Sequence, residues 1–521
     1  MPVPAPPRGP GGPGADAARA RAAIAVLAGI DFNMRPMFIN GKFTTGAASG
    51  EIYVHNPATE EVLDIVPRGT AEDINAAVIS AREAFDGWRV LGANDRTGLL
   101  HQVADNIRAH FDEIVNLLTL EEGKPVSENG EELEWVLNTF DYYAELGRHD
   151  RGRVIPPGEA SQFNFVLKEP YGVVGCIVPW NYPLLLMAWK VAPVLAAGNT
   201  VVIKPSEMTP LTTLYLAEHC FAHLPAGVVN VVTGYGAETG EPLVKHPDVP
   251  VIAFTGSLAT GQRIASIGAP MMKKLHLELG GKDALVIAED ADPEIAAKAV
   301  AYAALINAGQ VCTSTERVYV PDSQAKRFTE AIVEHVLSLR LGPGLEPATD
   351  MGPMIGEPYR AKFETHVEDA RKHGANILTG GQRPKHLPKG FFYEPTVLTG
   401  VNHGMLIMRE ETFGPAIPLM EYKSFDEAIA LTNDCQYGLG AVLLSNNPQK
   451  IKRFFEDVKA GTIWINDPLT DNYAGPFGGM KYSGGARELG QEGLDEFRET
   501  KHVHWDFNLE DKSYWYPYGR E

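Results

Sequence analysis

A single cysteine, Cys312, stands in the polar stretch NAGQVCTSTER, which covers residues 307–317. A free cysteine is most often a small, buried hydrophobic residue. Polar neighbours such as Gln310 and Thr313 instead indicate an accessible loop or the start of a helix, where amide dipoles lower the pKa of a thiol. The stretch therefore leaves two interpretations open, a filler of the core and a nucleophile.

A carboxylate earlier in the chain would complement such a nucleophile. Glu278 lies in KLHLELGGK, an alternating pattern that predicts a strand ending in a tight turn. A carboxylate among apolar neighbours tends to have a raised pKa, which suits a general base, although a partly exposed strand glutamate is the alternative. Together, a thiolate that attacks a carbonyl and a carboxylate that activates water can form and then hydrolyse a thioester.

Three further polar residues follow predicted strands. Asn181 lies between Pro179 and Pro183, and its amide can hydrogen-bond an oxyanion, a turn asparagine being the alternative. Lys204 and Glu207 follow the next strand, where a lysine and a carboxylate can bind the two hydroxyls of an adenosine ribose. An acid at that place favours NAD over NADP, because it would repel a 2′-phosphate.

Short, unbroken apolar runs supply the elements that would position these residues. They read VVGCIVP, TVVIKP, VVNVVTG, VIAFTGS and ALVIAED, with helical patterns between most of them. Continuous runs predict strands covered on both faces, hence a parallel sheet in an α/β domain. Ligands gather beyond the carboxyl ends of such strands. A second α/β pattern begins near Leu279 and continues through GAVLLS and GTIWIN.

Composition limits the class of protein. A chain of 521 residues is expected to form two or three domains. The net charge of −20, without a Lys/Arg block, argues against nucleic acid as a partner, and no apolar run is long enough for a membrane span. Four widely spaced cysteines without a CxxC pair predict neither a disulfide framework nor a metal site, so a reducing, cytoplasmic location is expected.

The N-terminal region divides into an extension and a helical part. Residues 1–15 are rich in Pro and Gly and are expected to be disordered, and residues 16–27 are expected to form a short helix. The sequence TAED at 70–73 is a capping-box signal for a helix start. Apolar residues at helical spacing follow it, and the helical pattern dominates as far as Leu146.

Seven motifs point to a known family. PWNYP, KPSE, FTGS, LELGGK, GQVC, EETFGP and PFGGMKYSG occur in the order and spacing of the NAD(P)-dependent aldehyde dehydrogenase superfamily, which the chain resembles over about residues 36–506. The resemblance implies an α/β fold with a Rossmann-like cofactor domain, an α/β catalytic domain and a β-hairpin oligomerisation element. The implied ranges are 33–147 and 171–279 for NAD binding, 280–482 for catalysis, and 148–170 with 483–507 for assembly into a homodimer or homotetramer. The extension at 1–32 and an aromatic tail at 508–521 lie outside these domains.

The resemblance also implies roles for residues at matching positions. Cys312 is the expected nucleophile, Glu278 the base for deacylation, Asn181 with the Cys312 backbone N–H the oxyanion hole, and Glu488 a proton relay. The expected cofactor ligands are Trp180, Lys204, Glu207, Ser257, Glu411 and Phe413. The expected substrate tunnel contains Tyr182, Leu186, Trp189, Asp471 and Phe477.

The implied reaction is the oxidation of an aldehyde to its acid through a cysteine thiohemiacetal and thioester, with NAD as cofactor and NADP as the less favoured alternative. Glu278 argues against a CoA-acylating dehydrogenase, whose members generally lack this base, and a catalytically idle protein on the same fold is the other alternative. The aromatic tunnel suits an apolar aldehyde. Negative charge from Asp467 and Asp471 would instead favour a cationic or hydroxylated one, unless this loop is merely solvated.

Two features depart from the family pattern. Ala486 stands where a glycine is usual, which questions the local turn and therefore the relay through Glu488. The tail extends beyond a typical family end and contains four large aromatic residues, Tyr514, Trp515, Tyr516 and Tyr518. Because such side chains are too apolar to lie in water without cost, we expect them to pack on a neighbouring subunit.

Overall fold

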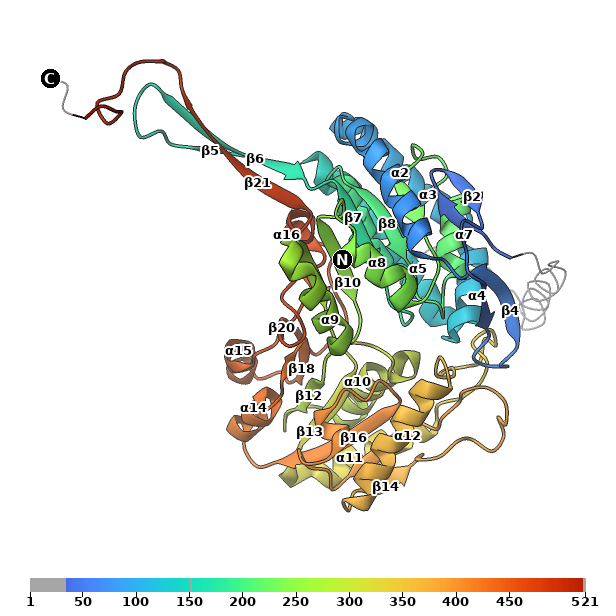
Figure 1. Ribbon diagram of the computed structural model, residues 1–521. Coiled ribbons are helices and arrows are strands. Elements are labelled where there is room, and N and C mark those ends of the chain that lie inside the picture. Colours follow the sequence, from blue (N-terminus) through green and yellow to red (C-terminus); the bar gives the residue numbers. More distant parts are fainter. Residues whose placement is uncertain (1–33, 150–151, 519–521) are drawn as a thin grey trace.

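The computed structural model describes residues 34–149 and 152–518, so the disorder expected for 1–15 and the helix expected at 16–27 lie outside the described residues. The body contains two seven-stranded sheets with helices packed against them (Figure 1). Within the described ranges, none of the helices has the length and hydrophobicity that a bilayer crossing requires. The predicted α/β class is confirmed.

The first sheet carries most of the unbroken apolar runs found in the sequence. Its strands, in spatial order, are β11 (Lys274–Glu278), β10 (Val251–Thr255), β7 (Val173–Ile177), β8 (Thr200–Lys204), β9 (Val229–Val231), β1 (Met37–Ile39) and β2 (Lys42–Thr44). The first five pair in parallel, and β1 and β2 add an antiparallel edge. Chain order reverses between β7 and β10, and such a switch point opens a crevice for ligands at the carboxyl ends.

Helices cover both faces of this sheet. They are α2 (Ala71–Arg89), α3 (Ala93–Ala109), α4 (Phe111–Glu122), α5 (Val126–Arg148), α6 (Pro183–Ala196), α7 (Leu211–His219), α8 (Glu241–Lys245) and α9 (Leu258–Gly268). Alternate strand residues enter different cores: Val174 and Cys176 pack with α3 to α7, whereas Val173 packs with α2, α8 and α9. Burial on both faces explains why these strands read as continuous apolar runs.

The start of α2 shows how local sequence sets an element. Thr70 accepts a hydrogen bond at the helix N-terminus, and its own backbone N–H donates to the Asp73 carboxylate at 2.9 Å. This reciprocal pair satisfies amides that the helix itself leaves free, a contribution of about 1 kcal/mol. The predicted capping box is confirmed.

The second sheet forms the other half of the body. Its order is β14 (Asn376–Thr379), β15 (Thr396–Thr399), β16 (Ala416–Tyr422), β13 (Thr315–Pro321), β12 (Asp283–Ile287), β18 (Gly440–Leu444) and β19 (Thr462–Ile465). The associated helices are α10 (Pro293–Leu305), α11 (Ala325–Leu337), α12 (Glu357–Lys372), α13 (Leu406–Arg409), α14 (Phe425–Asn433) and α15 (Pro448–Asp457). One hydrophobic core unites this half and includes Trp189 and Leu186 from α6 of the first half.

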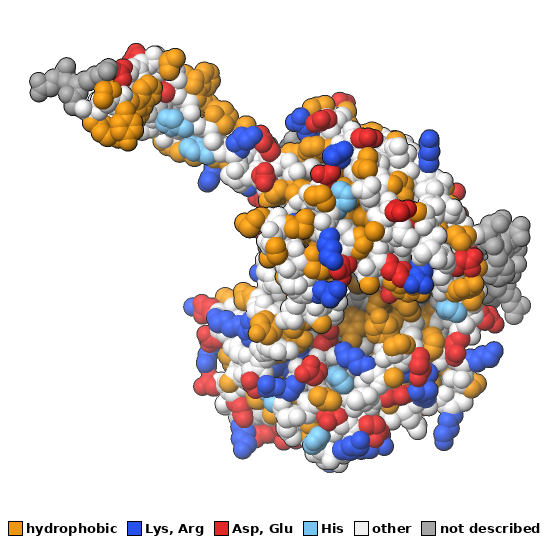
Figure 2. All heavy atoms as spheres, in the orientation of Figure 1, with side chains coloured by type: hydrophobic (Ala, Val, Ile, Leu, Met, Phe, Trp, Pro, Cys, Tyr) orange, Lys and Arg blue, Asp and Glu red, His pale blue; other side chains and the backbone are white. Residues whose placement is uncertain are grey.

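A long arm projects from the body (Figure 1). It consists of β5 (Arg153–Ile155), β6 (Gln162–Pro170) and β21 (Arg498–Asp506), the last following the short helix α16 (Gly490–Asp495). Strands β6 and β21 pair antiparallel over their whole length. Hydrophobic side chains cover much of the arm in Figure 2, and Trp505 and Phe507 are each more than half exposed.

Two short antiparallel strand pairs lie outside the two large sheets and the arm. They are β3 (Glu51–His55) with β4 (Val62–Pro67) and β17 (Tyr437–Gly438) with β20 (Met480–Lys481).

Candidate active site

Cys312 lies where two cavities meet. A smaller cavity of about 120 Å³ and a larger one of about 420 Å³ have two lining residues in common, Cys312 and Asn181. Asn181 comes from the turn between β7 and α6, in the first half of the body, whereas Cys312 comes from the loop before β13, in the second half. The structure thus brings the predicted nucleophile and the predicted oxyanion donor together at the junction of the halves.

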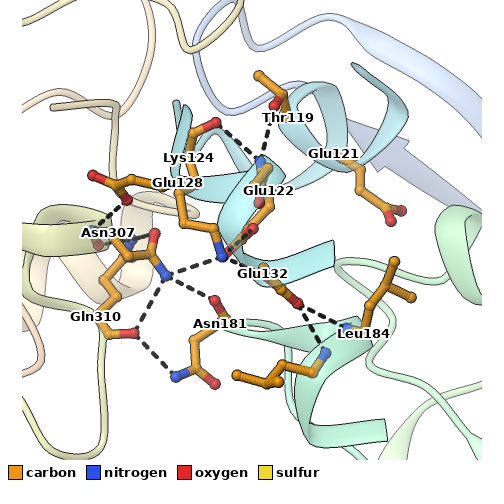
Figure 3. A network of polar contacts seen from close by, with 12 residues as sticks. Thr119, Glu121, Glu122, Lys124, Glu128, Glu132, Asn181, Leu184, Asn307 and Gln310 are labelled. Atoms are coloured by element: carbon orange, nitrogen blue, oxygen red, sulfur yellow. Dashed lines mark hydrogen bonds and ion pairs between the residues drawn. The ribbon is translucent and has the colours of Figure 1, made fainter. Parts of the chain in front are cut away.

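An unusual backbone precedes Cys312. Asn307, Ala308 and Gly309, in the 3₁₀ turn η3 (Ile306–Gly309), have φ values of 50°, 54° and 72°. A Cβ at Gly309 would lie 2.3 Å from the Gly414 carbonyl oxygen, so only glycine fits there. Left-handed backbone at non-glycine residues is costly and persists only when surrounding contacts impose it. Here the Glu128 carboxylate accepts the Asn307 backbone N–H at 2.9 Å (Figure 3).

The geometry around Asn181 leaves hydrogen-bond donors available. Its Nδ2 donates to the Gln310 carbonyl oxygen at 3.0 Å, which fixes the amide and uses one of its two protons (Figure 3). Among the described residues, no acceptor is found for the Cys312 backbone N–H. Two donors directed at one place in a buried site are what an oxyanion requires.

Glu278 ends β11 and is buried, with neither carboxylate oxygen hydrogen-bonded within the described part of the chain. Burial raises its pKa well above the usual range, and the nearby charge of Glu488 raises it further. The direction of this shift agrees with the sequence prediction. The carboxylate is not among the groups that line either cavity, although its neighbours Leu279 and Gly280 line the larger one.

Glu488 is fully buried and held by two partners. It forms an ion pair with Lys190 of α6 and accepts a hydrogen bond from His276 Nε2 at 3.1 Å. Although burial disfavours its charge, Lys190 and His276 hold the pKa of Glu488 below its usual range. Ala486 does not disturb this site: the positive φ values fall at Gly484 and Leu489, and Glu488 exchanges two backbone hydrogen bonds of 2.7 Å with Phe477.

The pKa of Cys312 differs from the sequence expectation. Burial raises it well above the usual range, and the carboxylates of Asp283, Glu278 and Glu411 raise it further. The expectation of a lowered pKa is therefore wrong for the protein without ligands. Burial and the charges of these carboxylates outweigh the local amide dipoles.

The larger cavity contains all the predicted cofactor ligands. Trp180, Lys204, Glu207, Ser257, Glu411 and Phe413 line it together with Cys312. Lys204 is buried at the end of β8, and its ammonium lies 3.2 Å from the Glu207 carboxylate, so further donors remain for a ligand. Ser257 caps α9, whose N-terminus therefore faces a site where an anion would be stabilised.

Near Cys312 the larger cavity is lined by Gly280 and by the aromatic rings of Trp180 and Phe413. Glu411 accepts the Gly281 N–H at 3.2 Å, and a Cβ at Gly280 would lie 2.4 Å from the Glu411 carboxylate. Burial raises the pKa of Glu411 to about 7. The Trp180 ring packs edge-on against Phe413, with centroids 5.5 Å apart. The Lys204–Glu207 pair, the N-terminus of α9 and the aromatic rings in the cavity that Cys312 lines suit a nicotinamide dinucleotide.

The smaller cavity contains all the predicted tunnel residues: Tyr182, Leu186, Trp189, Asp471 and Phe477. Trp189 and Phe477 pack with ring centroids 5.0 Å apart. Burial raises the pKa of Asp471 to about 7. Asp467 is exposed and is not one of the lining residues, but its charge acts on Tyr302, which is one of them.

Sequence reasoning missed much of this lining. The lining residues that were not predicted include Glu128, Glu131, Glu132, Trp135 and Tyr302. The first four lie at positions i, i+3, i+4 and i+7 of α5 and so share one helix face. That spacing was the available signal, but a charged helix face is more often solvated surface. Lys190 and His276, which hold Glu488, were missed as well.

This fold and site are those of an enzyme in which a cysteine attacks a carbonyl next to a cavity that suits a dinucleotide. The sequence model of the aldehyde dehydrogenase family matches residues 43–503. The chain belongs to the aldehyde dehydrogenase family. The predictions of fold, enzyme class and NAD as cofactor are confirmed.

Particular relatives are similar over nearly the whole chain. Betaine aldehyde dehydrogenase 1 of Oryza sativa subsp. japonica is 42% identical over 478 residues, which cover 90% of this chain and 95% of the relative. Aminoaldehyde dehydrogenase 2 (peroxisomal) of Pisum sativum is 40% identical, with the same shares covered. A crystal structure of betaine aldehyde dehydrogenase from Staphylococcus aureus in complex with NAD+ has a TM-score of 0.92 at 36% identity and covers 95% of this chain and 99% of that one.

Proposed function

We propose that the enzyme oxidises a small aldehyde carrying a positive charge, an aminoaldehyde or a trimethylammonium aldehyde, to its carboxylic acid. The observation that carries this proposal is the lining of the smaller cavity, which combines aromatic residues with the acidic residues Glu128, Glu131 and Asp471. Carboxylates and aromatic faces both attract an ammonium group. The names of the rice and pea relatives agree with this substrate class. An aldehyde carrying a carboxylate would be repelled by the same lining.

In the proposed reaction, Cys312 Sγ attacks the aldehyde carbon, and the oxygen that becomes negative receives hydrogen bonds from the Asn181 amide and the Cys312 backbone N–H. When bound, NAD+ supplies the oxidation by accepting a hydride, and its positive ring also favours the thiolate. Cys312 then holds the acyl group as a thioester. The side chains of Trp189 and Phe477 keep the acyl chain in a largely apolar passage.

Glu278 is proposed to take a proton from the water that hydrolyses the thioester. Its raised pKa makes it a strong base when ionised, and its burial without hydrogen-bond partners leaves it free to turn toward the acyl carbon. Glu488, with Lys190 and His276, is proposed to carry the proton away. The charges of Glu488 and Lys190 act on the Glu278 carboxylate, and both Lys190 and His276 are hydrogen-bonded to Glu488. Hydrolytic release by Glu278 also argues against CoA as the acyl acceptor.

The cofactor roles are proposed from the lining of the larger cavity. Lys204 and Glu207 would bind the adenosine ribose, and the Ser257 end of α9 would lie near the pyrophosphate. Glu411 would bind the nicotinamide ribose, with Phe413 and Trp180 beside the ring. The Glu207 carboxylate favours NAD over NADP by charge repulsion.

The test follows NADH absorbance at neutral pH with a panel of cationic, neutral and anionic aldehydes, with and without CoA. The proposal predicts turnover without CoA, a preference for the cationic aldehydes, and loss of turnover in Cys312→Ala. Cys435→Ala is the matched control, because Cys435 is another half-buried free thiol and lines neither of these cavities. Strict dependence on CoA would select an acylating dehydrogenase, and absence of turnover would select an idle protein on the same fold.

Assembly and compartment are also proposals. We propose that the arm and the aromatic tail mediate formation of a homodimer or homotetramer, because Tyr514 and Tyr516 in the tail are more than two-thirds exposed and Trp505 on β21 is more than half exposed. A reducing compartment such as the cytoplasm is supported by the four cysteines, which are all free. Light scattering and cell fractionation test the two statements.

A further inference from the structure

Lys124 is a buried lysine near the junction where Asn181 and Cys312 meet. The side chains of Lys124, Glu122 and Glu132 are all 0% exposed. The Lys124 ammonium lies 3.2 Å from Glu122 and forms a closer ion pair with Glu132 (Figure 3). It also lies 3.6 Å from the centroid of the Tyr182 ring. Lys124 lines neither cavity, and the reaction described above makes no use of it.

Glu132 connects this lysine to the Asn181 turn. Its carboxylate accepts the backbone N–H groups of Leu184 and Leu185 at 3.1 and 3.0 Å (Figure 3). These amides belong to the first turn of α6, only three residues beyond Asn181, and a helix leaves such amides without internal partners. Glu132 therefore holds the segment that carries the predicted oxyanion donor.

Glu122 connects the same lysine to the Cys312 loop. Its carboxylate accepts Asn307 Nδ2 at 3.0 Å, and the same Nδ2 donates to the Asn181 carbonyl oxygen at 2.8 Å (Figure 3). Asn307 is one of the left-handed residues that precede Cys312. The two carboxylates paired with Lys124 thus hold opposite sides of the site, one in each half of the body.

We propose that Lys124 is a positioning residue that fixes Asn181 relative to Cys312, because its two ion pairs hold the carboxylates of Glu132 and Glu122 in place. Without this cation the two buried carboxylates lose their common partner, and the contacts that each makes to its own side of the site loosen. The Asn181 turn and the left-handed loop would then be free to separate. This inference rests on the proposed oxyanion role of Asn181 and the Cys312 N–H.

The experiment measures the rapid burst of NADH, which reports thioester formation, in Lys124→Met, Asn181→Ala and the double variant. Met preserves the stem of the side chain and removes the charge. A displaced oxyanion donor lowers the burst rate by about 100-fold in Lys124→Met. In the Asn181→Ala background the same substitution costs less than about 3-fold, because residues that act as one unit are not additive.

Two further readouts separate positioning from general loosening. The NAD+ affinity and the rate of Cys312 alkylation by iodoacetamide stay within about 2-fold of wild type in Lys124→Met, since alkylation forms no oxyanion. Lys326→Met, on the surface of α11 with a side chain 88% exposed, is the matched control and leaves the burst unchanged.

Asn307→Gly provides a second variant that leaves no buried charge unpaired. Glycine accepts the left-handed backbone at this position, while the link from Glu122 to Asn181 is lost. Asn307→Gly is expected to lower the burst rate, and its effect is expected to be much smaller when Asn181→Ala is already present. A normal burst in both Lys124→Met and Asn307→Gly, or losses that persist undiminished in the Asn181→Ala background, would overturn the inference while leaving the proposed function intact. A wild-type enzyme that oxidises no aldehyde would overturn both.

Discussion

Asp471→Asn tests whether the carboxylates of the smaller cavity select a cationic aldehyde. The substitution keeps the size of the side chain and removes its charge. The measured quantity is the ratio of kcat/KM for trimethylammonioacetaldehyde to kcat/KM for its neutral isostere, 3,3-dimethylbutanal. Changes in the thiol or the base affect both substrates and cancel in this ratio.

The expected magnitude follows from the size of the cavity. In a space of about 120 Å³ a bound cation lies only a few ångströms from Asp471. Opposite unit charges about 5 Å apart, in an effective dielectric of about 20, attract by about 3 kcal/mol. The ratio should therefore fall by about 100-fold in Asp471→Asn at pH 8.

The pH dependence provides an independent check. Burial raises the pKa of Asp471 to about 7, so the free enzyme carries this charge at pH 8 and has largely lost it at pH 6. The pKa of Glu128 is also raised to about 7 by burial. In wild type the ratio should rise with pH as both groups ionise, and in Asp471→Asn the rise between pH 6 and 8 should be smaller by about 10-fold.

The assay is steady-state NADH formation at pH 6, 7 and 8 with both aldehydes. Asp467→Asn is the matched control, because Asp467 belongs to the same loop but is exposed and does not line the cavity. The reasoning is refuted if Asp471→Asn slows both substrates equally, or if Asp467→Asn lowers the ratio as much.

Three further predictions concern the base, the cofactor and the tail. Glu278→Gln should release one NADH per active site in a burst and then turn over at least about 100-fold more slowly than wild type, and stopped-flow traces without a burst would contradict this. Glu207→Gln should raise kcat/KM with NADP by about 10-fold, or about 1.4 kcal/mol of relieved repulsion, and an unchanged ratio of NADP to NAD activity would count against the ribose role. A chain ending at Glu510 should change either the oligomeric state in light scattering or the aldehyde preference, and a chain that changes neither would remove the proposed role of the tail.

The parts of the fold and site that follow from local sequence were predictable. Strands buried on both faces read as continuous apolar runs, and the capping box at Thr70 marks a helix start without reference to the rest of the chain. Asn181 lies in the turn after β7 and Lys204 is the last residue of β8, so the topology of a parallel sheet gathers them at one edge.

Interactions between distant segments were not predictable in the same way. The hydrogen bond from Asn307 to Glu122 joins residues 185 positions apart, and nothing in either local pattern indicates it. The pKa of Cys312 was wrongly predicted for the same reason, since its burial and the nearby charges of Asp283 and Glu411 both come from other parts of the chain. Helix α5 is an intermediate case, because its acidic face was visible but its burial was not.

The linings of the two cavities have only Cys312 and Asn181 in common. Substitutions on the aldehyde side can therefore accumulate without touching the dinucleotide side, provided that those two residues stay in place. The arrangement lets one oxidation chemistry be adapted to new metabolites by exchanging a single wall, and it offers protein engineers the same freedom.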